Sequence, residues 1–209
     1  MSAYHQPLLP DHIYHLFSRA VGNEKLFLTS ENYIFFLSKL KQHTSAVCSI
    51  YCYSLLPNHF HLVVRINQEE IIIKHFEEIK KRAYHPINDK ISDFIMERFS
   101  NFLNSYTKSF NKVNNRKGGL FMDYMKRSLA ESNEDFITFV WYVHKNAVHH
   151  NLRKNIGEWP YDSYNSILSD LPTLLLRKEA IGLFGSKADF VKFHQQAVHP
   201  KVNLNMADL

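Results

Sequence analysis

Three segments in the first third of the chain are predicted to be β-strands: the first mixes aromatic and β-branched residues, and in the third the side chains alternate cleanly between two faces. Gly22 and Asn23 interrupt the pattern after the first segment, and Pro57 and Asn58 mark a turn between the second and the third. A later segment alternates less regularly and ends in two basic residues. The four predicted strands are 12–21, 46–55, 59–66 and 120–129.

Between and after these strands the apolar residues recur every three or four positions, which predicts α-helices. The first helix begins near Ser30, where Thr29 or Ser30 is available as an N-cap. Ser132 and Asp135 resemble a capping box and predict the start of the last long helix. We expect helices from residue 30, at 69–83, at 91–111 and at 132–150, followed by a small helical tail.

The predicted elements follow one another as β-α-β-β-α-β-α. This order is typical of a ferredoxin-like, α+β fold, in which a four-stranded antiparallel sheet carries helices on one face. We therefore expect the other face to be open and available for a functional site. The 209 residues suit a single domain, with a core at about 12–168 and a C-terminal helical extension at about 169–209.

The third predicted strand places two histidines on that open face. Residues i and i+2 of a strand share a face, so His59 and His61 project together, opposite Phe60 and Leu62. A lone histidine is more often a core residue with satisfied hydrogen bonds, but the alternation argues against that interpretation for this pair. Two neutral imidazoles on an accessible face are suited to binding a divalent metal ion.

Two more polar side chains share one side of the last long helix. Tyr142 and Asn146 are four residues apart and therefore lie one above the other. Helical geometry places them on a flank of the apolar stripe that includes Val140 and Val143. A tyrosine in this position is more often a packing residue than a nucleophile, so the spacing alone leaves both roles open.

The composition narrows the class of protein. Hydrophobic residues make up 45% of the chain and aromatic residues 14%, which indicates a globular protein. No apolar run is long enough for an ordinary membrane-spanning helix, and the N-terminus lacks the pattern of a secretory signal. Two cysteines, Cys48 and Cys52, cannot build a disulfide framework, so we expect a cytoplasmic protein. The net charge of +5 is compatible with nucleic acid as a partner.

Several segments resemble, in the same order, the motifs of REP-associated tyrosine transposases, which belong to the single-tyrosine HUH transposases. The segment 56–64, LPNHFHLVV, is similar to the HUH motif, where U is a bulky apolar residue. The segment 142–146, YVHKN, is similar to the family's Tyr-Ile-His-x-Asn-Pro motif. Weaker similarities lie at 15–19, 119–127 and 159–164, so the resemblance covers about 12–168. The chain departs from the pattern where the family usually has proline, glycine and serine, at Ala147, Ala20 and Asp162.

This resemblance implies a metal-dependent nuclease that nicks and rejoins single-stranded DNA through a 5′-phosphotyrosine intermediate. Tyr142 would be the nucleophile, and His59, His61 and Asn146 would bind Mg²⁺ or Mn²⁺. The implied partner is single-stranded or hairpin DNA, and both a monomer and a homodimer are compatible with the resemblance. Candidate phosphate contacts are basic residues near the sheet and its loops, each equally compatible with an ordinary surface charge: Arg19, Lys108, Arg116, Lys117, Lys126 and Arg127.

Two other functions remain open. The first is a non-catalytic, domesticated protein that binds single-stranded or hairpin nucleic acid, although such a protein has no need for two histidines, a tyrosine and an asparagine to converge. The second is a structural zinc protein that uses some of the histidines. That alternative lacks paired cysteine ligands, and a structural zinc site normally needs four close ligands; its candidates are His59, His61, His144, His149 and His150.

Overall fold

Four strands form one antiparallel sheet in the computed structural model of the chain, which describes residues 6–122 and 125–196. Their order across the sheet is β2-β3-β1-β4. The predicted α+β class with a four-stranded antiparallel sheet is confirmed. The strands are β1 (Ile13–Arg19), β2 (Cys48–Leu56), β3 (His59–Ile66) and β4 (Lys126–Leu129).

The fourth strand is shorter than the predicted segment 120–129. Only four residues of β4 pair with β1, opposite Tyr14 to Phe17. At the other end of the segment, Phe121 forms an isolated bridge with Ala20, and the Met122 amide donates a hydrogen bond to the Arg19 carbonyl. The segment therefore pairs with the first strand at both ends, while residues 123 and 124 lie outside the described part of the chain.

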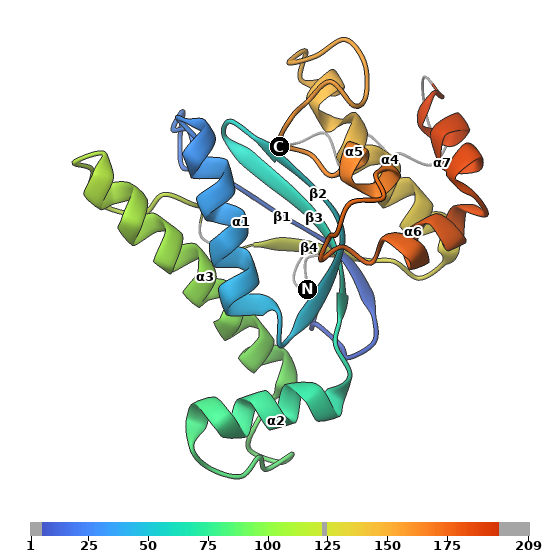
Figure 1. The fold of residues 1–209 in the computed structure, drawn as a ribbon. Helices are drawn as coiled ribbons and strands as arrows, with labels where there is room; N and C mark the ends of the chain where they lie inside the picture. The colour runs from blue at the N-terminus through green and yellow to red at the C-terminus, as the bar shows by residue number, and fades with distance from the viewer. Residues whose placement is uncertain (1–5, 123–124, 197–209) are drawn as a thin grey trace.

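Two long helices, α1 (Ser30–Thr44) and α3 (Ile91–Val113), cover one face of the sheet, and α2 (Glu69–Lys80) packs against α3 (Figure 1). Aromatic side chains fill the space between. The ring of Phe36 on α1 lies 5.1 Å from that of Phe60 on β3 and 4.8 Å from that of Phe102 on α3. All three are fully buried, and a buried phenylalanine contributes roughly 1.5–3 kcal/mol to stability. This core holds β3 in place.

The opposite face of the sheet was expected to be free of helices, and this expectation needs correction. The helix α4 (Asn133–His149) packs on β2 and β3, where its Val140 and Val143 meet Cys52 and Val63 in a second core (Figure 1). Behind it lie α5 (Tyr164–Leu168), α6 (Arg177–Phe184) and α7 (Lys187–His194). The predicted helical tail thus includes α6 and α7, whereas 197–209 lie outside the described residues.

No helix within residues 6–122 and 125–196 has the length and apolar character needed to cross a membrane.

Candidate functional site

The third strand holds His59 and His61 on the face that α4 covers. Their ring centroids are 5.2 Å apart, and the ring planes are perpendicular. Across the sheet, the Cα partners on β1 are Arg19 for His59 and Phe17 for His61. The predicted orientation of both histidines toward one face is therefore correct. The shared face is a consequence of the two-residue period of a strand.

The helix α4 brings Tyr142 and Asn146 to the same two histidines. The Tyr142 ring stands edge-on to the His61 ring with centroids 5.4 Å apart, and Asn146 Oδ1 lies 3.0 Å from Nε2 of His59. Ser132 begins this helix by accepting a hydrogen bond from the Asp135 amide, as its capping-box pattern predicts. The four side chains singled out in the sequence thus meet at one place.

The site is closed to solvent, whereas the sequence suggested accessible imidazoles. His59 is 2% exposed, His61 is not exposed, and Tyr142 and Asn146 are 4% and 1% exposed. The reason is the packing of α4 on β2 and β3, which places its Tyr142 flank directly over the histidines. Any large substrate can reach these groups only if the covering elements move.

A third histidine, His15 on β1, joins the site and was missed as a functional residue in the sequence. Its Nε2 lies 2.9 Å from Nδ1 of His61, and its ring centroid lies 5.8 Å from that of Tyr142. The signal in the sequence was the alternation of the first strand, because His15 and Phe17 share a face. What the sequence could not show was that this face pairs with the His61 face of β3.

Burial keeps these imidazoles neutral. Removal from water lowers the pKa of His59 to about 4 and that of His15 to about 3, and holds the pKa of His61 well below its usual range. His150, whose ring centroid lies 4.7 Å from that of His59, also has a lowered pKa because of burial. At neutral pH the ring nitrogens without a proton therefore carry lone pairs, which is the form that binds metal.

The hydrogen bonds of His59 and His61 suit a divalent cation. Nδ1 of His59 lies 2.8 Å from Asn58 Oδ1, and a neutral ring that donates there keeps a lone pair on Nε2, facing Asn146 Oδ1. In that tautomer, two electron-rich atoms approach each other at 3.0 Å. Nε2 of His61 is buried and has no hydrogen-bond partner among the described residues. A cation would satisfy these three atoms, and the residues present fit one.

A ligand set made only of histidine, cysteine, aspartate and glutamate is not formed in the described part of the chain, where no three such side chains are grouped around one position. The zinc alternative required such a set. His144 belongs to a different cluster, in which its Nδ1 lies 3.0 Å from Nε2 of His194 and its Nε2 lies 2.9 Å from Oγ of Ser163. A metal at His59 and His61 would therefore depend on the asparagine.

The six basic residues predicted as phosphate contacts differ in their surroundings. Arg19, Lys108 and Lys117 have exposed side chains. Arg116 is engaged by Glu24 at 3.0 Å and by Asn111 at 3.0 Å.

The remaining two are on β4. Lys126 lies over the Phe17 ring at 5.9 Å, beside the His61 position. Arg127 is 9% exposed and donates hydrogen bonds to the Gln6 carbonyl and the Met96 sulfur. In this structure Arg127 faces the interior and Lys126 is half-buried. Of the three exposed residues, Arg19 also donates a hydrogen bond from Nε to the Met122 sulfur.

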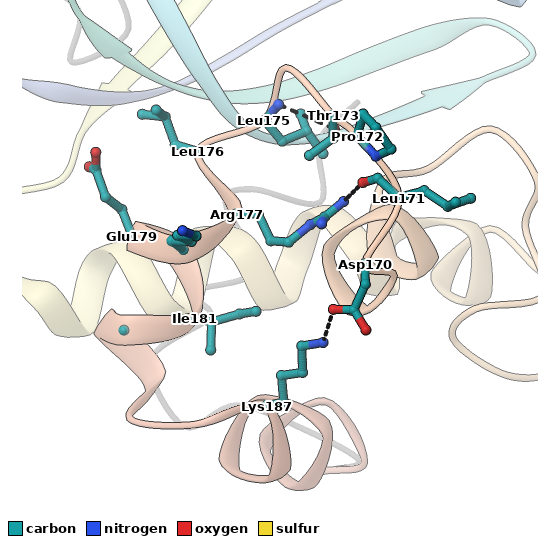
Figure 2. Close-up of a pocket in the computed structure, with 12 residues that line it drawn as sticks. Asp170, Leu171, Pro172, Thr173, Leu175, Leu176, Arg177, Glu179, Ile181 and Lys187 are labelled. Atoms are coloured by element: carbon teal, nitrogen blue, oxygen red, sulfur yellow. Dashed lines mark hydrogen bonds and ion pairs between the residues drawn. The ribbon is translucent and has the colours of Figure 1, made fainter.

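A hollow with a volume of about 800 Å³ lies in the C-terminal tail. Figure 2 shows the side chains around it, among them Arg177 and Lys187. Both cations are engaged within the chain, Arg177 with the Leu171 carbonyl at 2.6 Å and Lys187 with Asp170 at 2.8 Å. None of the converging residues on β3 and α4 lines this hollow.

Comparisons with known proteins bear on the fold. No protein-family model matches the chain, and no curated protein is significantly similar to it in sequence. A solved structure of a REP-associated tyrosine transposase bound to a REP hairpin is similar to it, with a TM-score of 0.61 over 82% of this chain and 89% of that chain. The fold is that of a REP-associated tyrosine transposase. At 14% identity the likeness concerns the fold, and it agrees with the resemblance seen in the sequence motifs.

Proposed function

We propose that the chain is a single-tyrosine nuclease of the HUH type, a transposase that nicks and rejoins single-stranded or hairpin DNA. The convergence of Tyr142, His59, His61 and Asn146 from two elements carries this proposal. The order of the motifs in the sequence and the fold of the transposase bound to a hairpin support it. A fold alone hosts many functions, so the argument depends on the site.

The chemistry proposed for Tyr142 is nucleophilic. Its phenol oxygen attacks the scissile phosphorus and loses its proton, the bond from phosphorus to the 3′ oxygen breaks, and that oxygen leaves as a 3′-hydroxyl. The 5′ end then remains linked to Tyr142 as a phosphotyrosine. Because this diester keeps the energy of the broken bond, attack by a 3′-hydroxyl reverses the step and joins DNA without ATP.

The polar side chains around Tyr142 are suited to binding a metal ion next to the nucleophile. His59, His61 and Asn146 would hold Mg²⁺ or Mn²⁺ through the three atoms that face one another or lack a partner. When bound, the ion supplies Lewis acidity toward the scissile phosphate. The cores that flank β3 and α4 fix the distance between nucleophile and ligands, which is the positioning that phosphoryl transfer requires.

The burial of the site favours one other function, a protein that binds hairpin or single-stranded nucleic acid without cutting it. Tyr142 is 4% exposed, so a scissile phosphate cannot contact it in the closed conformation. A catalytic protein must therefore uncover Tyr142 when DNA binds and still keep α4 against β3, whereas a binding protein has no such requirement.

The deciding experiment compares wild type with Tyr142→Phe on labelled single-stranded hairpin DNA from the flanks of the gene, in Mn²⁺. Wild type should form a covalent adduct that survives denaturation, and Tyr142→Phe should form none, because it lacks the attacking oxygen. Tyr51→Phe is the matched control, since it removes the hydroxyl of a buried tyrosine that bonds Glu179 on the same side of the sheet. Equal DNA binding by all three proteins with no adduct from any would establish the binding function instead.

A further inference from the structure

Each of the two histidines proposed as ligands has a hydrogen-bonding partner behind its ring. Nδ1 of His59 faces Asn58 Oδ1 at 2.8 Å, and Nδ1 of His61 faces Nε2 of His15 at 2.9 Å. In both rings the other nitrogen, Nε2, is the one left for a cation: that of His59 faces Asn146 Oδ1, and that of His61 has no hydrogen-bond partner among the described residues. Metal-bound histidines usually donate their second N–H to such a partner, which fixes the tautomer and the orientation of the ring.

The contact between His15 and His61 contains one hydrogen. Two neutral imidazoles at this distance share a single N–H, which belongs either to His61 Nδ1 or to His15 Nε2. If His15 carries it, the second proton of the pair is on His61 Nε2, and that atom cannot bind a cation. If His61 Nδ1 carries it, His61 Nε2 has a free lone pair.

The surroundings hold the His15 ring in the position needed to accept that hydrogen. Its centroid lies 4.9 Å from that of Phe17, 5.4 Å from that of Phe139 and 5.1 Å from that of His61. The side chain is 1% exposed, so water does not compete for its Nε2. The pairing of β1 with β3 fixes the backbone of both residues.

We propose that His15 is a positioning residue whose Nε2 accepts the Nδ1 hydrogen of His61 and so keeps the Nε2 lone pair of His61 available to the metal ion. Asn58 performs the same task for His59 through its amide oxygen. This inference rests on the proposed metal-dependent function. It assigns to the first strand a part in the site that the two known motif segments, on β3 and α4, do not include.

The test measures Mn²⁺ affinity by calorimetry on the full chain, for wild type, His15→Phe and His15→Gln. Phenylalanine keeps an aromatic ring but has no acceptor, so Mn²⁺ affinity should fall about 10- to 100-fold. Glutamine places an amide oxygen near the former Nε2 and should recover a large part of the affinity. The nitrogen NMR shifts of His61 in metal-free wild type should show the proton on Nδ1.

A matched control is available in the second pair of buried histidines. His194→Phe removes the partner of His144 Nδ1 in the same way, 3.0 Å away, in a cluster that contains no proposed ligand. It should leave Mn²⁺ affinity within about twofold of wild type. A general effect of losing a buried histidine would instead lower the affinity in both variants and would overturn the specific role of His15.

The outcomes separate this inference from the proposed function. If wild type binds Mn²⁺ no better than a His59→Ala, His61→Ala double variant, the metal site itself fails, and the inference fails with it. If wild type binds and His15→Phe binds equally well, only the role of His15 is overturned. A His61 proton found on Nε2 in the NMR spectrum of wild type would overturn that role without any variant.

Discussion

At the scale of single residues, buried polar groups distinguish the side of the sheet that α4 covers from an ordinary apolar core. Three of them, His15, His59 and His61, are neutral because burial lowers their pKa. Asp162 is the acidic counterpart, because burial raises the pKa of its carboxyl to about 7. Its Oδ1 accepts a hydrogen bond from the Tyr164 amide, while Oδ2 has no partner among the described residues. Serine, common in the resembling family at this position, would avoid the cost of that charge.

The raised pKa of Asp162 predicts a pH-dependent loss of stability. The folded protein holds this proton more tightly than the unfolded chain, so stability should fall as pH rises from about 4 to about 7 and stay low above that. Asp162→Asn keeps the oxygen that faces the Tyr164 amide and cannot ionise. It should therefore be more stable than wild type at pH 8, by on the order of 4 kcal/mol, and similar to wild type near pH 4.

Urea denaturation of wild type and Asp162→Asn at about pH 4 and about pH 8, which span that interval, measures this difference. Other titrating groups are common to both proteins and cancel in the comparison. Asp170→Asn, at an exposed carboxyl paired with Lys187, is the control and should show little gain at pH 8. If Asp162→Asn gains the same stability at both pH values, the gain does not come from removing the buried charge of the ionised Asp162 carboxylate.

At the scale of elements, α4 carries both the second core and half of the proposed site. Val140 and Val143 pack on the sheet, Tyr142 and Asn146 contact the histidines, and His144 contacts α7 through His194. The helix is therefore buried on most of its circumference, unlike a surface helix with one apolar stripe. Its start depends on Ser132, because this side chain satisfies a backbone N–H that has no partner within the helix.

Removal of this cap should weaken the folded state as a whole. Ser132→Ala is expected to lower the free energy of unfolding by about 1 kcal/mol, the usual loss for an N-cap serine. Ser109→Ala is the matched control, because Ser109 lies inside α3 and its hydroxyl bonds back to the Ser105 carbonyl of the same helix. That change should have an effect close to zero, since alanine favours a helix interior. Equal losses in urea denaturation would show that Ser132 acts as an ordinary helix residue.

The elements themselves were largely predictable, and their packing was not. The alternation around His59 and His61 predicted β3 and the face of both histidines, and the capping pattern at Ser132 predicted the start of α4. The packing of α4 over the histidines could not be predicted, because the apolar stripe of a helix does not determine which face of a sheet it packs against. The role of His144 was equally hidden, since its partner His194 lies fifty positions away along the chain, in the tail.

At the scale of the whole molecule, the sheet is enclosed between two helical layers (Figure 1), so the proposed function needs contacts to DNA from outside the sheet. The basic loop after α3 offers one. Arg116 in this loop is held by Glu24 and Asn111, so it fixes the backbone, and its neighbour Lys117 has an exposed side chain. We therefore expect Arg116 to shape the loop and Lys117 to contact phosphate.

These different roles of Arg116 and Lys117 predict how the proposed hairpin binding depends on salt. Each phosphate contact adds about 0.7 to 0.9 to the slope of log affinity against log salt, because a bound cation is released from the DNA. Lys117→Ala should reduce the slope by about that amount without changing thermal stability. Lys178→Ala, at an exposed lysine on α6 in the tail, should leave the slope unchanged. Should both variants reduce the slope equally, the DNA would be contacting the tail as well, and the loop after α3 would have no special role.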